Sequence, residues 1–199
     1  GGSQRYKSES RNGVEYSAYL GNEHKIMPRL TLEYGLRVSM YNYIGKGTAY
    51  YYKDTIENYT RPLTYTHTFS QGKLIKDYVI PEPRFSANYV INNYSSIKLS
   101  YNRMAQYLQL ISNTAASTPV DVYTLASNDL KPLIADQGSA GYFRNLKDNM
   151  FETSFEVYYK YLQNQLDYID GADLFINPHV ESQLLQGLGR AYGAEFYVK

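Results

Sequence analysis

The stretch Leu30-Thr31-Leu32-Glu33-Tyr34-Gly35-Leu36-Arg37-Val38-Ser39-Met40-Tyr41 decides how the rest of this sequence is interpreted. Every even position in it is apolar, and the odd positions carry Thr, Glu, Gly, Arg, Ser and Tyr. Successive side chains of a β-strand point to opposite faces, so the pattern predicts a strand with one apolar and one polar face. Ordinary strands have about 5–6 residues, whereas a tilted strand that crosses a bilayer needs about 9–11. The stretch therefore has membrane-spanning length.

The composition excludes several classes of protein. The chain has 199 residues, 24 Tyr, 7 Phe, no Cys and a formal net charge of +1. This charge balance argues against a nucleic-acid surface, and the lack of Cys excludes disulfide scaffolds and thiolate zinc sites. No apolar run approaches the length of a transmembrane helix. The mean hydropathy of −0.50 fits a soluble protein or a membrane β-barrel, because half of each barrel strand faces water.

The same alternation recurs along the chain and predicts about seven strands. They are expected over residues 14–20, 30–41, 85–91, 97–102, 140–144, 151–161 and 188–198. Between two of them the apolar spacing changes to a helical period, which predicts one or two helical turns over 104–112.

The connections between the expected strands differ in length. Turn residues near 21–28, 92–95 and 145–149 predict short connections, and polar loops are expected near 42–83, 104–136 and 164–186. Outer-membrane barrels alternate short periplasmic turns with long extracellular loops. A soluble sandwich has shorter strands and more frequent turns. The pattern thus predicts an all-β fold of antiparallel up-and-down strands that form part of a transmembrane β-barrel.

The alternation assigns each strand two faces. Residues on the apolar face are expected to face lipid: Leu32, Tyr34, Leu36, Val38, Leu99, Tyr101, Phe155, Val157 and Tyr159. Residues on the polar face are expected to face the lumen: Glu33, Arg37, Lys98, Asn102, Glu152, Glu156 and Glu195. Burying these charges in a dry core without partners would be prohibitive, so the polar face requires water or a polar filler.

Three segments in succession resemble strand signatures of TonB-dependent outer-membrane receptors. They are Leu32-Glu33-Tyr34-Gly35-Leu36-Arg37, then Pro83-Arg84-Phe85-Ser86-Ala87-Asn88-Tyr89 leading to Leu99-Ser100-Tyr101-Asn102-Arg103, then Gly189-Arg190-Ala191-Tyr192-Gly193-Ala194-Glu195-Phe196. The resemblance implies a 22-stranded barrel that holds a globular plug. Residues 1–199 would then be a partial barrel domain with no plug domain in this chain, located in the outer membrane of a Gram-negative bacterium.

The resemblance also implies a function and partners. The chain would be a barrel-wall portion of a receptor that takes up a ligand such as a metal chelate, a vitamin or an oligosaccharide. Its partners would be outer-membrane lipid and, through parts absent from this chain, the TonB complex. Gln106 and Tyr107, just beyond the strand that ends at Arg103, and Tyr123 in the loop that follows are expected near the ligand path, because of this position and the amphipathic aromatic chemistry. The alternative for these three is packing of loop residues on one another.

The sequence offers no motif for catalysis or for a cofactor. Gly45-Lys46-Gly47-Thr48 lacks the first glycine of a phosphate loop. Glu152 and Glu156 would lie about 13 Å apart along a strand, too far for paired acid–base chemistry. We therefore interpret the chain as neither an enzyme nor a cofactor protein. A soluble β-rich ligand-binding or adhesin module is the alternative function, and it would partition into water without detergent.

No metal site is expected either. Asp167, Asp170 and Asp173 could in principle bind calcium, but the EF-hand spacing is absent and turn-forming aspartates in a solvated loop explain them. The three histidines lie far apart in the sequence, without a partner at helical spacing.

Overall fold

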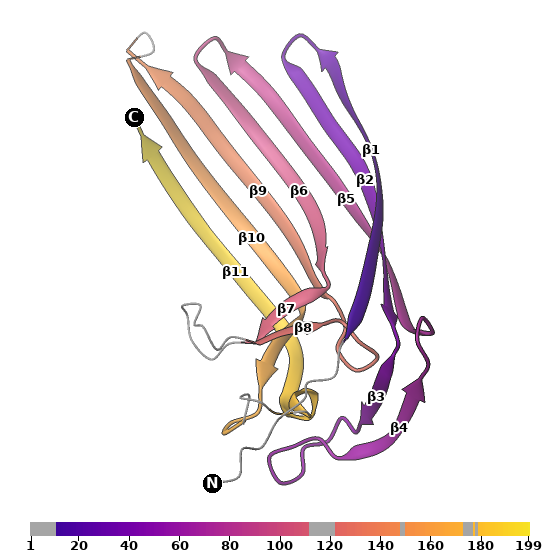
Figure 1. The fold of residues 1–199 in the computed structure, drawn as a ribbon. Helices are drawn as coiled ribbons and strands as arrows, with labels where there is room; N and C mark the ends of the chain where they lie inside the picture. The colour runs from indigo at the N-terminus through magenta and orange to yellow at the C-terminus, as the bar shows by residue number, and fades with distance from the viewer. Residues whose placement is uncertain (1–10, 112–121, 148–149, 173–176, 178) are drawn as a thin grey trace.

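The computed structural model of the chain describes residues 11–111, 122–147, 150–172, 177 and 179–199. A curved sheet of seven antiparallel strands dominates it, in the spatial order β1-β2-β5-β6-β9-β10-β11 (Figure 1). These strands are β1 (Asn12–Met27), β2 (Leu30–Ile44), β5 (Leu74–Asn92), β6 (Ser95–Gln106), β9 (Leu133–Leu146), β10 (Phe151–Tyr168) and β11 (Leu184–Val198). The all-β antiparallel prediction is confirmed. Within the described residues the sheet is open, with β1 and β11 as its outer strands.

Two small ribbons and one short turn complete the fold. β3 (Gly47–Tyr52) pairs with β4 (Leu63–Phe69), and β7 (Leu108–Ile111) pairs with β8 (Val122–Leu125). The 3-10 turn η1 (Val180–Gln183) leads directly into β11. Figure 1 shows both ribbons at one end of the sheet and the tight hairpin turns at the other.

The register carries each face across the whole sheet. Tyr34 of β2 is paired with Phe85, which is paired with Tyr101; Tyr101 is opposite Gly138, and Gly138 is opposite Tyr159. Because paired residues point to the same side, the apolar positions of successive strands form one continuous face.

The first hairpin is tighter than the sequence predicts. The expected connection over 21–28 is wrong, because β1 and β2 stay paired as far as Met27 opposite Leu30, which leaves a turn of only two residues. Gly21 lies inside β1, opposite Gly35. A Cβ atom at either glycine would come within 3 Å of the Tyr19 ring or its hydroxyl, so both positions accommodate that side chain. This glycine therefore permits a close approach and does not mark a turn.

The helical turns expected over 104–112 are also wrong. β6 continues to Gln106, and β7 pairs with β8. Within β7, buried Gln109 and Ile111 alternate with exposed Leu108 and Leu110, which is the period of a strand. A short apolar run fits either period, and here pairing with a later segment decides the conformation. Residue 112 lies outside the described residues.

The long connections are shorter than the sequence predicts because the strands continue beyond the alternating segments. Between strands of the main sheet they cover residues 45–73, 107–132 and 169–183. The first contains the β3–β4 ribbon. Parts of the other two, including Asp173, lie outside the described residues.

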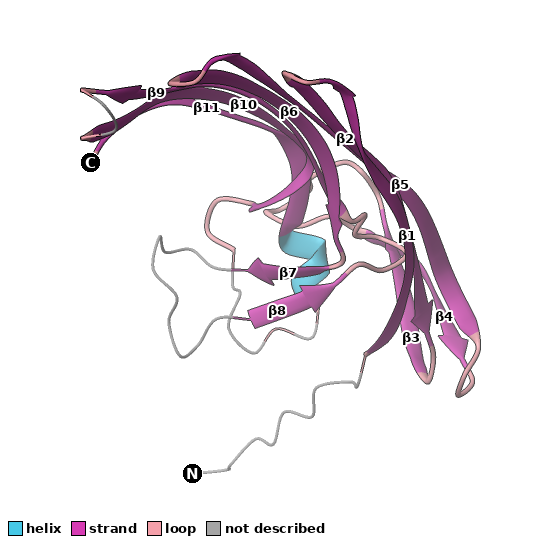
Figure 2. Cartoon of the chain, turned by 90° about the horizontal axis from the view of Figure 1, so that it is seen from above, coloured by secondary structure: helices cyan, strands magenta, loops and turns pink. Residues whose placement is uncertain are grey.

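The end of the sheet that carries the two ribbons and the three long connections is called the loop end. The packed core lies on the concave side of the sheet near this loop end. Figure 2 shows β7, β8 and η1 inside the curve. One cluster joins β2, β5 and the start of β7 through Tyr41, Tyr43, Ile80, Tyr107 and Ala126. A second joins the end of β7 to η1 and β11 through Ile111, Leu130, Val180 and Leu184. The β7 strand thus spans the concave side from one part of the wall to another.

Candidate functional site

The convex face of the sheet is predominantly apolar and is not covered by other described residues; towards the end with the long connections it also carries the Arg103–Asp136 ion pair. All nine residues predicted to face lipid lie on it, since they occupy one continuous set of paired positions. Eight of them are between 37% and 50% exposed, and Leu32 is half-buried. Soluble monomers rarely expose a contiguous apolar surface of this kind, so the face has the properties of an interface with an apolar medium.

The concave face carries the seven residues predicted to face the lumen. Lys98, Glu156 and Glu195 occupy one row across the sheet, with Gly141 between the first two. Arg37 pairs with Glu15 at 3.0 Å and with buried Glu82 at 3.7 Å. The other predicted lumen charges make no ion pair with the described residues; they are Glu33, Lys98, Glu152, Glu156 and Glu195.

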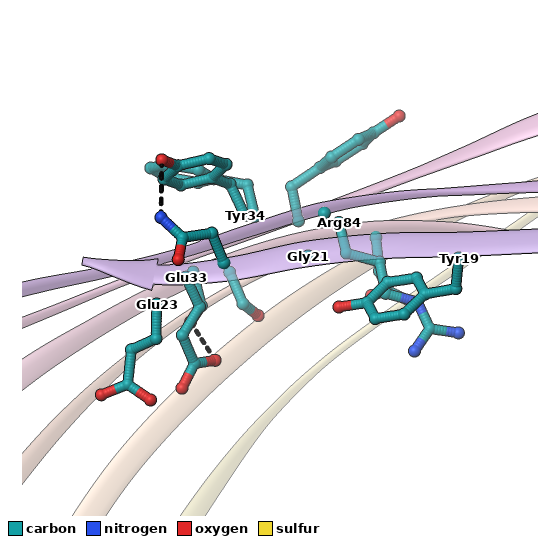
Figure 3. Close-up of a pocket in the computed structure, with 13 residues that line it drawn as sticks. Tyr19, Gly21, Glu23, Glu33, Tyr34 and Arg84 are labelled. Atoms are coloured by element: carbon teal, nitrogen blue, oxygen red, sulfur yellow. Dashed lines mark hydrogen bonds between the residues drawn. The ribbon is translucent and has the colours of Figure 1, made fainter.

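A shallow pocket of about 440 Å³ lies on the wall formed by β1, β2, β5 and β6 (Figure 3). Glu23 and Glu33 are opposite each other in the register and point to the same side, whereas Tyr34 points to the other. Glu33 accepts a hydrogen bond from Ser86 at 3.0 Å, and Arg84 also lines the pocket. Side chains of both charge signs on an open surface suit hydrogen bonding to a polar partner.

The loop end of the concave face is filled by the chain itself. Tyr107 is 4% exposed, and its ring stacks on Tyr41 with centroids 4.7 Å apart and planes 6° apart. Its hydroxyl lies 2.6 Å from the Ser39 hydroxyl, which is itself fully buried. This placement favours the packing alternative for Tyr107 over direct contact with a ligand.

The other two predicted ligand residues are accessible but do not form one site with Tyr107. Gln106 is exposed, and its side-chain amide donates to the Leu108 carbonyl at 2.7 Å. Tyr123 of β8 is 63% exposed and is paired with Leu110. Leu108 and Leu110 lie with Tyr123 on the exposed face of the β7–β8 ribbon. The sequence did not predict this exposed face, because its apolar spacing indicated a helix over 104–112. The ligand role of Gln106 and Tyr123 stays a prediction.

Sequence reasoning also missed the buried charges of the loop end. Glu82 and Glu181 are each 3% exposed, and Asp129 pairs with Arg61. Glu82 lies in a segment of β5 that the sequence placed in a loop, and the other partners come from separate connections. Because these residues are far apart in the sequence, no local motif predicts that they are close together in the fold.

In the part of the chain that the structure describes, no three His, Cys, Asp or Glu side chains are grouped to hold a metal ion. The described residues include no helix that is both long enough and apolar enough to cross a membrane.

Comparisons with solved structures identify the fold. The chain resembles the alcaligin outer membrane receptor FauA from Bordetella pertussis (TM-score 0.53, 16% identity, 94% of this chain and 27% of that one). It also resembles the ferric-catecholate import receptor Fiu from E. coli K12 (0.54, 14%, 94% and 25%). A third match is the Serratia marcescens hemophore receptor HasR, solved with its hemophore HasA and heme (0.58, 14%, 94% and 32%).

The chain spans about a quarter to a third of the length of these proteins, which are receptors and not enzymes. No curated protein matches the sequence. The family model described as "TonB dependent receptor-like, beta-barrel" matches residues 1–198. Barrels of this family are outer-membrane proteins of Gram-negative bacteria. The chain belongs to the TonB-dependent receptor β-barrel family.

Proposed function

We propose that this chain is a barrel-wall portion of a receptor that takes up a ligand across the outer membrane. The observation that carries the proposal is the division of one sheet into an exposed apolar convex face and a charged concave face. A membrane barrel has this division, because lipid contacts the outer surface and water or protein fills the interior. A soluble module would have to cover the convex face.

The concave face supports a second part of the proposal. Near the loop end the chain's own ribbon and η1 fill the concavity, whereas near the hairpin turns Glu23, Glu33, Arg84 and Lys98 are open to a partner. A polar filler such as a plug domain would satisfy these charges and hydrogen-bonding groups. Residues 1–199 would then be a single partial barrel domain, with the plug and the contact with the TonB complex supplied by other parts of the protein.

For the ligand we propose an iron complex. Among the similar proteins, Fiu is an import receptor for ferric catecholate, and HasR was solved in complex with its hemophore and heme. A vitamin or an oligosaccharide is the alternative. Uptake of ⁵⁵Fe-loaded chelates and heme by cells with and without the intact receptor tests this choice, and accumulation that does not depend on the receptor would refute it.

The orientation of the wall has a direct test in two neighbouring residues. Val157 lies on the convex face near the middle of β10, in the row that includes Leu99, and Glu156 lies on the concave face. We expect Val157→Arg to cost about 2–4 kcal/mol, as a charge near the bilayer midplane does, and Glu156→Arg to be tolerated.

The measurement is the fraction of intact receptor that is assembled in the outer membrane and resists unfolding in detergent at low temperature. Equal assembly of both variants would contradict lipid contact on the convex face. Recovery of the intact protein in a detergent-free soluble fraction would favour the soluble binding module instead.

A further inference from the structure

Four segments that are distant in the sequence meet at one group of charges near the loop end, in which Arg11 is 27% exposed and the other three side chains are 10% exposed or less. Arg11 precedes β1, Arg61 lies between β3 and β4, Asp129 follows β8, and Glu181 lies in η1. Arg11 forms an ion pair with Glu181, and Arg61 forms one with Asp129. We call these four residues the loop latch.

Further hydrogen bonds connect the same segments. The Arg61 backbone N–H donates to the Ser182 carbonyl at 2.8 Å, and its guanidinium donates to the Glu181 carbonyl at 3.2 Å. The Thr60 hydroxyl donates to the Ser182 hydroxyl at 3.0 Å. The Ser127 hydroxyl donates to the Glu181 carboxylate at 3.2 Å, which joins the β8–β9 connection to η1. Each connection is therefore bound to the other two.

The burial of the latch determines how it can open. The side chain of Glu181 is 4% exposed, and those of Arg61 and Asp129 are 10% and 9% exposed. When one partner of a buried ion pair is withdrawn, the other is left as an uncompensated charge in a poorly solvated place. Withdrawing the β3–β4 connection would strand Asp129, withdrawing the β8–β9 connection would strand Arg61, and withdrawing η1 would strand Arg11. Joint exposure of all partners to water avoids this penalty.

We propose that the loop latch joins residues 50–61, 126–131 and 179–183 into a single unit that opens only as a whole. These three segments would then not act as independent gates over the lumen. The inference goes beyond the proposed function, because it holds whichever ligand the receptor carries.

The test is hydrogen–deuterium exchange on the intact receptor in detergent. Glu181→Gln removes the negative charge that pairs with Arg11 in the loop latch. Glu57→Gln is the matched control, because Glu57 is exposed and lies in the same β2–β5 connection as Arg61. We expect Glu181→Gln to raise amide exchange about tenfold or more in all three segments together, because exchange follows the opening equilibrium. The control should leave exchange unchanged. Faster exchange confined to 179–183 would overturn the proposal.

A second pair of variants keeps the test decisive if Glu181→Gln does not assemble. Residues 1–199 contain no cysteine, and the Thr60 and Ser182 hydroxyls lie 3.0 Å apart, so Thr60→Cys with Ser182→Cys introduces one neighbouring thiol pair between two of the segments. If the latch is one unit, oxidation should slow exchange at 126–131, which contains neither cysteine. Protection limited to the cysteine-bearing segments would refute the inference, and each single cysteine variant serves as the control.

Discussion

Substitutions at Tyr107 separate the packing role of this residue from a role in ligand contact. Tyr107→Ala removes a buried ring that stacks on Tyr41. Loss of a buried aromatic side chain costs about 3–5 kcal/mol, and a stacked pair adds about 0.5–1.5 kcal/mol beyond its buried area. Tyr107→Phe keeps the ring and removes only the hydrogen bond to Ser39, which is worth about 0.5–1.5 kcal/mol.

The two variants should therefore differ strongly in local stability. The Ala126 amide donates to the Tyr107 carbonyl at 2.7 Å, so its hydrogen exchange reports on the attachment of this ribbon to the wall. Because 1.4 kcal/mol corresponds to about a factor of ten, Tyr107→Ala should speed exchange at Ala126 by about a hundredfold or more. Tyr107→Phe should speed it by about tenfold or less.

The assay is exchange measured at single-residue resolution on the intact receptor, with wild-type protein as the reference. If exchange at Ala126 is equally fast in both variants, the ring contributes nothing and the packing argument is wrong. If neither variant changes exchange but Tyr107→Ala reduces uptake of the ligand, the residue acts in ligand contact and not in packing.

Two further predictions concern the loop end and the hairpin end of the wall. Burial raises the pKa of the Asp129 carboxyl above its ordinary value of 3.8, and the Arg61 guanidinium opposes that rise. The folded state then binds this proton more tightly than the unfolded state. The free energy of unfolding should therefore fall as the pH rises from 3.8 through the folded-state pKa of Asp129. Asp129→Asn should flatten this part of the pH profile of unfolding. At the hairpin end, a Cβ on Gly35 would lie 2.7 Å from the Tyr19 hydroxyl and 3.0 Å from a backbone oxygen. Gly35→Ala should lower stability in denaturant titrations by about 1–3 kcal/mol. Gly47→Ala, where no atom lies within 4 Å of the added Cβ, is the control, and equal losses would show that the Tyr19 contact is unimportant.

The sequence by itself determined the number of wall strands and the face on which each side chain lies. Alternation has a period of two and is complete within each strand, so Leu36 and Arg37 are assigned to opposite faces without knowledge of their neighbours. The structure places every predicted member of each set on one common face. The contrast between short turns and long loops could also be predicted, because it depends only on local composition.

Only the tertiary structure decided where strands end and what fills the concave side. β7 has a strand conformation because β8 pairs with it, and Tyr107 is buried because Tyr41 lies beneath it. The Arg61–Asp129 ion pair of the loop latch joins residues of two separate connections. Such contacts depend on pairing and burial between segments far apart in the chain. A local pattern fixes the direction of a side chain, but its partner is fixed only when the curved wall brings the segments together.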